Sequence, residues 1–216
     1  MSPDKYGCST IRNVYYDTDN YRLIRRSIER PIYKEKLRLR SYLRADGDTP
    51  VFAELKKKYD HVVYKRRISL PLVVAERWLN SRESPGIDTQ ITREIDYFLD
   101  YYGGMRPTVF LSYDREAYYS DSDPSFIITF DSNILCRRDR LSLCEDTGGV
   151  SILDGGMVLM EIKCSGGIPL PVIKILSEEK IYKTNFSKYG TAYKKMIFNC
   201  IKEDDNHDRE LIQRLV

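Results

Sequence analysis

The sequence has few residues of the kinds that carry covalent chemistry or bind zinc. It contains five cysteines with no CxxC pair, and its two histidines, His61 and His207, lie far apart. An odd number of scattered cysteines favours reduced thiols in a cytoplasmic protein over a disulfide framework or a zinc site. Because no histidine accompanies a nucleophile motif, a Ser/His/Asp or Cys/His mechanism has no support.

Long apolar runs and a strong net charge are also absent. No stretch approaches the roughly 20 apolar residues that a membrane-spanning helix needs, and the N-terminus shows no signal-peptide pattern. These absences predict a cytoplasmic protein without direct membrane insertion. The 35 basic residues nearly balance the 32 acidic ones, which leaves a formal net charge of +3. An anion-binding site must therefore come from the arrangement of cations rather than from total charge.

The sequence does contain a series of short extended segments. With 216 residues, of which 42% are hydrophobic, the chain is long enough to bury a substantial core. Alternating patterns between turn residues predict strands at Ile11–Tyr16, Tyr33–Tyr42, Val51–Tyr59, Val62–Leu70, Thr108–Tyr118, Phe126–Ile134 and Met157–Cys164. Helices are predicted at Leu72–Arg82, Thr89–Tyr101 and Pro171–Lys195. The expected fold class is mainly β (α+β), an antiparallel β-barrel tunnel with the helices packed outside.

Basic side chains gather on one face of consecutive predicted strands. Because alternate residues of a strand share a face, the first basic strand places four cations together: Lys34, Lys36, Arg38 and Arg40. The next two strands add Lys56, Lys58, Lys65 and Arg67, with Glu54 among them. The spacing Glu-x-Lys returns later at Glu161 and Lys163. The solvated face of a half-buried sheet also alternates in this way, so the pattern alone leaves an exposed face open. The clustering of Lys and Arg on adjacent strands favours an inward one.

An inward face with so many cations requires an anionic ligand. Two like charges about 6 Å apart repel by roughly 3 kcal/mol at an effective dielectric near 20. Phosphate suits such a face, because Arg binds it in bidentate fashion and Lys supplies a point charge. Carboxylates among the cations, at Glu54 and Glu161, suit Mn²⁺ or Mg²⁺ held together with phosphate oxygens. The face therefore predicts phosphoryl transfer by positioning and charge neutralisation, without a covalent nucleophile.

Seven short motifs occur in order between about Ile11 and Lys195. They are Asn13–Thr18 (like YFDT), Lys36–Arg40 (R-x-R), Glu54–Lys56 (E-x-K), the basic strand with Lys65, Tyr113–Tyr118 (Y-x-R), Leu159–Lys163 and Phe186–Tyr189 (S-K). Together they resemble the VTC domain, the polyphosphate-polymerase domain of the CYTH-like superfamily of triphosphate tunnel metalloenzymes. On this resemblance, residues 1–200 are expected to form one VTC-like domain and residues 201–216 a polar C-terminal tail.

The resemblance implies a polymerase that transfers phosphoryl groups from ATP or another nucleoside triphosphate to a growing polyphosphate chain, with Mn²⁺ or Mg²⁺ as cofactor. It implies catalytic roles for Arg38, Arg40, Lys56, Lys65, Arg115 and Lys163. Phosphate contacts are expected from Lys36, Arg67, Ser187 and Lys188. Glu161 would hold the metal, with Glu54 as a weaker candidate. Because Arg115 shares a strand face with Val109, Leu111 and Tyr113, it can face the tunnel only through a bulge or a mixed lining.

Two features depart from the family pattern. The family begins with a strand that carries a lysine, followed by a helix, and no counterpart precedes the YFDT-like segment here. The domain is thus expected to be N-terminally truncated, with an incomplete barrel whose open edges favour a homo-oligomer. In addition, Ile127 stands where the family usually has an arginine. Two alternatives therefore stay open, an inorganic triphosphatase and a non-catalytic module that binds polyphosphate or nucleotide. Nucleic acid is not an expected partner, because the face from Lys34 to Arg40 carries no aromatic side chains for base stacking.

Overall fold

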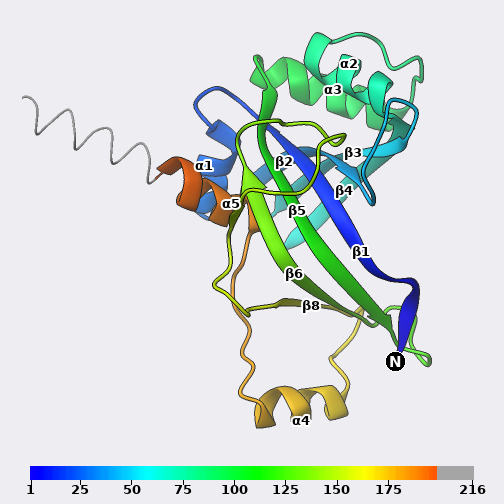
Figure 1. Cartoon of the computed structure of the whole chain (residues 1–216), viewed down its shortest axis with the longest axis vertical. Coiled ribbons are helices and arrows are strands. Elements are labelled where there is room, and N and C mark those ends of the chain that lie inside the picture. The colour runs from blue at the N-terminus through cyan, green and yellow to red at the C-terminus, as the bar shows by residue number, and fades with distance from the viewer. Residues whose placement is uncertain (199–216) are drawn as a thin grey trace, which may run out of the picture.

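The computed structural model describes residues 1–198, so the predicted tail 201–216 lies outside the described residues. Its main feature is one antiparallel sheet of eight strands (Figure 1). The strands are β1 (Ser2–Asp17), β2 (Tyr33–Ser41), β3 (Pro50–Tyr59), β4 (Val62–Pro71), β5 (Arg106–Tyr119), β6 (Ile127–Arg137), β7 (Val150–Ser151) and β8 (Leu159–Lys163). Every predicted strand is present, and only the two-residue β7 was not predicted.

The strands are ordered β4-β3-β2-β1-β5-β6, and both β7 and β8 pair with β6. Within residues 1–198 no ladder joins β4 to β8, so the sheet stays open between these two strands. The mainly β, antiparallel fold with helices outside the sheet confirms the predicted fold class, and the barrel is incomplete. A long, strongly twisted β1–β5–β6 unit forms its centre (Figure 1).

One face of the sheet, here called the helix-covered face, packs against α2 (Leu72–Ser81) and α3 (Gln90–Tyr102). Leu37 and Leu39 of β2 lie in this core, both almost fully buried. Trp78 is also buried there, and its indole Nε1 donates to Asp96 Oδ1 at 2.8 Å. The alternation in β2 thus places leucines in a core and, by the strand period, its cations on the opposite face.

The opposite face, here called the cationic face, is partly covered by α1 (Arg22–Ile28), α5 (Lys188–Tyr193) and a π-helical turn (Lys194–Phe198). Asp17, at the end of β1, holds α1 in place because its carboxylate accepts from the backbone N–H groups of Leu23 (2.9 Å) and Ile24 (3.0 Å). The same carboxylate accepts from the Tyr189 hydroxyl at 3.0 Å. Asp17 therefore ties the first and last helices of the cationic face to β1.

The prediction of one helix over Pro171–Lys195 is wrong. The structure has α4 (Leu170–Glu178), then a non-helical segment, and then α5. Two local features separate the helices: Lys180 adopts a left-handed backbone with φ of 54°, and the Ser187 side chain caps a new helix by accepting from Gly190 N. Helix α4 has no buried residue and lies apart from the sheet (Figure 1).

Candidate functional site

Cross-strand register places the predicted cations of three strands in rows on the cationic face. Lys36 of β2, Lys56 of β3 and Lys65 of β4 are direct neighbours. The adjacent row is Arg38, Glu54 and Arg67. Directly opposed side chains on one face of a sheet lie within contact distance, so each row is a continuous strip of charge. Like charges are opposed in the first row, whereas a carboxylate separates them in the second.

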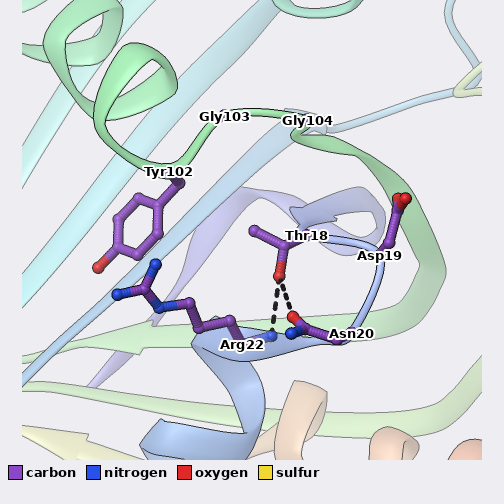
Figure 2. A pocket seen from close by; sticks show the side chains of 7 residues that line it. All are labelled: Thr18, Asp19, Asn20, Arg22, Tyr102, Gly103 and Gly104. Carbon is purple, nitrogen blue, oxygen red and sulfur yellow. Dashed lines mark hydrogen bonds between the residues drawn. The ribbon is translucent and has the colours of Figure 1, made fainter.

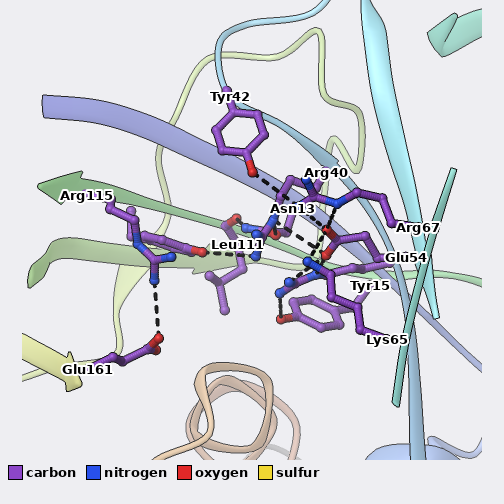
Figure 3. A network of polar contacts seen from close by, with 12 residues as sticks. Asn13, Tyr15, Arg40, Tyr42, Glu54, Lys65, Arg67, Leu111, Arg115 and Glu161 are labelled. Atoms are coloured by element: carbon purple, nitrogen blue, oxygen red, sulfur yellow. Dashed lines mark hydrogen bonds and ion pairs between the residues drawn. The ribbon is translucent and has the colours of Figure 1, made fainter. Parts of the chain in front are cut away.

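Glu54 is the centre of the first charge cluster, and its side chain is 1% exposed. Its carboxylate accepts from Arg38 Nε at 2.8 Å and Arg67 Nε at 2.6 Å, and Lys65 Nζ lies 2.9 Å away. Arg40 Nε lies at 3.8 Å (Figure 3). Burial alone would raise the pKa of Glu54, but Arg38 and Arg40 outweigh it and hold the pKa well below its usual range. The Glu54 side chain is therefore ionised, and cations contact both of its oxygens.

Asp131 and Glu161 form the centre of a second cluster. Asp131 is fully buried, and its carboxylate accepts from Arg115 at 2.6 and 2.7 Å. Lys188 Nζ lies 2.6 Å from Asp131 and 2.8 Å from Glu161. Arg115 also lies 3.5 Å from Glu161 (Figure 3). Burial would raise the pKa of Glu161, but the charges of Lys188 and Arg115 outweigh this effect and lower the pKa below its usual value. This carboxylate, which is 38% exposed, therefore stays ionised.

The N-terminus of α5 connects the two clusters. Ser187 accepts from Lys36 Nζ at 2.8 Å, and the next residue, Lys188, reaches the second cluster. The two clusters also interact across the face. Burial and Arg38 lower the pKa of Lys56, and Glu161 partly offsets them, although four strands lie between β3 and β8 in the sheet order. The sheet therefore brings the predicted residues of β2, β3, β4, β5 and β8 around a common space.

Two of the lysines predicted to be catalytic have no bonded partner on this face. Within the described part of the chain, neither Lys56 nor Lys163 forms an ion pair or a hydrogen bond, and both residues reach solvent. Lys163 lies directly across from Ile127 in the β6–β8 pair, so the two side chains share a face and Ile127 lies on the cationic face. These two unpaired charges, one on β3 and one on β8, are therefore available to an anion.

Arg115 reaches this face through a mixed lining. Tyr113, on the same face of β5, is buried, and the Arg115 guanidinium lies 5.2 Å from the centre of its ring. The β5–β6 register also shifts between Ser112 and Asp114, where Asn133 adopts φ of 48°. Because this irregularity lies on β6 and β5 pairs regularly with β1 around Arg115, the mixed lining accounts for the inward placement of Arg115.

Sequence reasoning missed three groups that support the cations. Asp131 is buried between Arg115 and Lys188, although its strand is otherwise apolar enough to resemble core. The hydroxyl of Tyr15 accepts from Arg38 at 3.0 Å, and the hydroxyl of Tyr113 accepts from Arg40 at 3.2 Å. The sequence signals Asp131 only by its strand position, since it shares a face with Ile127 and Thr129. Nothing beyond their strand positions marks Tyr15 and Tyr113.

Lys36 gives a pH-dependent prediction. Burial, together with Lys56 and Lys34, lowers the pKa of Lys36 to about 8. Half of the Lys36 side chains are therefore neutral at pH 8 in the free protein, and a bound polyanion raises the pKa again. Binding of tripolyphosphate at pH 8 should take up as much as about half a proton, and affinity should fall between pH 7 and 9. Calorimetry in two buffers of different protonation enthalpy measures the uptake. Lys36→Met should lose this component, and equal uptake in both proteins would contradict the assignment.

The residues present fit a divalent cation at one place. Glu161 offers a hard oxygen ligand that is partly exposed beside the uncompensated lysines, whereas Glu54 and Asp131 are buried against cations. Among residues 1–198 no group of three His, Cys, Asp or Glu side chains could hold a metal alone. A cation here would therefore take Glu161 together with ligand phosphate oxygens, as Mg²⁺ commonly does. Metal roles for Glu161 and Glu54 stay predictions.

A separate pocket of about 320 Å³ lies outside the cationic face, between the turn after β1 and the end of α3 (Figure 2). It is lined by Thr18, Asp19, Asn20, Arg22, Tyr102, Gly103 and Gly104. None of the predicted phosphate-binding residues lines it.

No helix within residues 1–198 has the length and apolar character needed to cross a bilayer.

An open antiparallel sheet whose cations converge on one face agrees with the fold that the resemblance to the VTC domain implies. The chain belongs to the VTC domain family, because residues 2–197 match the model of that domain. A solved structure from Bacillus halodurans, described as a candidate adenylate cyclase, shares the fold with a TM-score of 0.51 and 16% identity, over 85% of this chain and 81% of that one.

Two further solved structures are less similar. A candidate adenylyl cyclase from Hippeastrum, described as having a dominant triphosphatase activity, has a TM-score of 0.49 and 16% identity, over 84% of this chain and 80% of that one. A Pyrococcus horikoshii protein has a TM-score of 0.43 and 15% identity, over 88% of this chain and 86% of that one. Comparison with the curated proteins gave no match.

Proposed function

We propose that this VTC domain transfers phosphoryl groups from a nucleoside triphosphate such as ATP to a polyphosphate chain on its cationic face. The observation that supports it best is the row of three lysines, Lys36, Lys56 and Lys65, opposite a second cluster that contains Glu161. A chain of phosphates carries negative charge at regular intervals, and two rows of cations on neighbouring strands match such a ligand.

The carboxylates of the face favour an anionic acceptor. In the transfer, the bond between the γ-phosphorus and its bridging oxygen breaks, a terminal oxygen of the polyphosphate forms the new P–O bond, and the nucleoside diphosphate leaves. That terminal oxygen is already anionic and needs no base. Cations hold the pKa of Glu54 and Glu161 below the usual range, so both are weak bases for activating water. This property supports polymerisation over hydrolysis.

Each part of the face has its own role in this proposal. Arg38, Arg40, Lys65 and Arg67 would bind phosphates on the side of Glu54, while Arg115, Lys163 and Lys188 would do so on the side of Asp131. Ser187 would orient Lys36 through the bond that it already makes. Glu161 would hold Mn²⁺ or Mg²⁺, which neutralises charge on the phosphate oxygens. The ion pairs with Glu54, Asp131 and Glu161 hold these cations near one another before the ligand arrives.

The direct test is incubation of the protein with ATP and Mn²⁺, followed by gel detection of polyphosphate and measurement of free phosphate. Polymer is the expected product. Free phosphate without polymer would indicate the triphosphatase instead. Tight binding without turnover would indicate a non-catalytic module, which Ile127 favours because it leaves an apolar side chain opposite Lys163.

A matched pair of lysines tests the face itself. Lys56 lies on the cationic face, whereas its neighbour Lys57 faces α3, with Nζ 3.9 Å from Glu94. Lys56→Met should weaken tripolyphosphate binding about tenfold, as expected for one charge-assisted contact. Lys57→Met should change it less than about twofold, because surface ion pairs away from the ligand contribute little. Calorimetry compares the two, and equal losses would count against the cationic face as the binding site.

A further inference from the structure

Two buried arginines lie on the helix-covered face, on the opposite side of the sheet from the cationic face. Arg12 of β1 is 9% exposed, and Arg137 of β6 is 3% exposed. Their cross-strand neighbours on β5, Ser112 and Phe110, are two residues apart and share a face. Burial lowers the pKa of both guanidinium groups, and the charge of Arg12 adds to the lowering at Arg137. Two close, buried cations of this kind require compensation.

Arg137 is compensated by the protein itself. Its guanidinium stacks on the Phe110 ring, 3.7 Å from the centre. It donates to four backbone carbonyls, those of Asp139, Arg140, Asp146 and Gly148, at 2.9–3.3 Å. Arg137 is therefore a buried arginine whose Nε, Nη1 and Nη2 all donate to backbone carbonyls.

Arg12 has no such partners. Within residues 1–198 its guanidinium makes no hydrogen bond, and its Nε is buried without an acceptor. The nearby carboxylates are engaged elsewhere: Asp146 lies 2.8 Å from Arg44, and Asp114 accepts from Thr10 at 2.7 Å. A charged donor left unpaired in this way costs more than a neutral one, and the cost is recovered when an acceptor binds.

Two hydroxyls flank the same guanidinium. Ser41 of β2 and Ser112 of β5 are the direct cross-strand neighbours of Arg12. Each is 1% exposed, and the Oγ of each lacks a partner. Directly opposed side chains have Cβ atoms about 5 Å apart, so the two hydroxyls flank Arg12 on the same face of the sheet, one on each side. A water molecule would satisfy the hydroxyls but leave the charge uncompensated.

We propose that Arg12, Ser41 and Ser112 bind one oxyanion of the size of orthophosphate, at a site distinct from the cationic face. The guanidinium would donate in bidentate fashion and neutralise the charge, and the two hydroxyls would donate to further oxygens. The site lies on the reverse side of the strands that carry Arg40 and Tyr113, next to them in the sequence of β2 and β5. It is independent of the proposed activity, because no residue is shared between the two sites.

The test is titration of the protein with inorganic phosphate at constant ionic strength, with the Arg12 Nε–H resonance followed by NMR and assigned through Arg12→Lys. Phosphate should shift this resonance saturably. Ser41→Ala and Ser112→Ala should each weaken binding about fivefold, as expected for one hydrogen bond. Lys56→Met should leave the titration unchanged, which separates this site from the cationic face.

A second measurement, the melting temperature with and without phosphate, keeps the proposal testable if a variant folds poorly. Arg12→Met removes the uncompensated charge, so this variant should be at least as stable as the wild type without phosphate, and phosphate should raise its melting temperature less. An Arg12 resonance that phosphate does not shift would overturn the proposal. So would a resonance that moves in Asp146→Asn or Asp114→Asn without phosphate, because a carboxylate of the protein would then be the partner.

Discussion

Replacing Glu54 with glutamine should lower the free energy of unfolding by about 3 kcal/mol at pH 7. The substitution keeps the size of the side chain but leaves Arg38, Lys65 and Arg67 without their shared counter-charge. This predicted loss is at the lower end of the range for breaking a buried ion pair. The reason is that Lys65 and Arg67 are 44% and 32% exposed, so water screens their charges in part. Urea denaturation measures the difference.

The pH dependence of this difference has a defined sign. The pKa of Glu54 is depressed in the folded protein, so its stabilisation is present above the ordinary value of 4.5 and is lost as the pH falls below it. The gap in unfolding free energy between wild type and Glu54→Gln should therefore begin to narrow as the pH falls below about 4.5 and should shrink further toward the depressed pKa. Asp146→Asn is the matched control, since its ion pair with Arg44 is exposed and should contribute less than about 1 kcal/mol. Equal effects of the two variants would show that Glu54 is not the centre of the cluster.

Glu161→Gln should reduce polymer formation with ATP and Mn²⁺ at least about 100-fold, because it removes the one partly exposed carboxylate that residues 1–198 place on the face. Lys188 keeps its contact with Asp131 at 2.6 Å, so the cluster should stay folded. Binding of tripolyphosphate without metal should be unchanged or tighter, since a negative charge has gone. This separation of turnover from binding distinguishes a metal ligand from a structural residue.

Glu116→Gln is the control for this experiment. Glu116 is exposed on β5, next to Arg115 in sequence but on the other side of the strand, and should have no effect on turnover. Full activity of Glu161→Gln would refute the metal role of Glu161 and leave the binding face intact. Loss of both binding and turnover would instead indicate that the second cluster had been disrupted.

Alternation along single strands could be predicted from the sequence because it is encoded locally. Lys36, Arg38 and Arg40 appear on one side of β2 with Leu37 and Leu39 on the other, as the two-residue period requires. The break at Lys180 was missed because an apolar pattern continues through Ile181 and Tyr182, while the left-handed residue that ends the helix has no glycine to mark it.

The pairing of charges could not be predicted in the same way. Whether Asp131 meets Lys188 depends on how α5 packs over β6, and that contact joins residues 57 positions apart in the chain. The orphan guanidinium of Arg12 was equally hidden, because only the register of β1 with β2 and β5 sets two serines beside it. Sequence patterns gave the faces of the strands, and tertiary packing decided which groups met.

The absence of a ladder between β4 and β8 within residues 1–198 has a mechanical consequence. Across that interval, the first and second clusters are joined by the Ser187–Lys188 step, through Lys36 on one side and Asp131 and Glu161 on the other. A bound phosphate chain could replace side-chain contacts of this sort, whereas it could not replace a backbone ladder. We therefore expect the spacing between the two clusters to change with the number of phosphates bound.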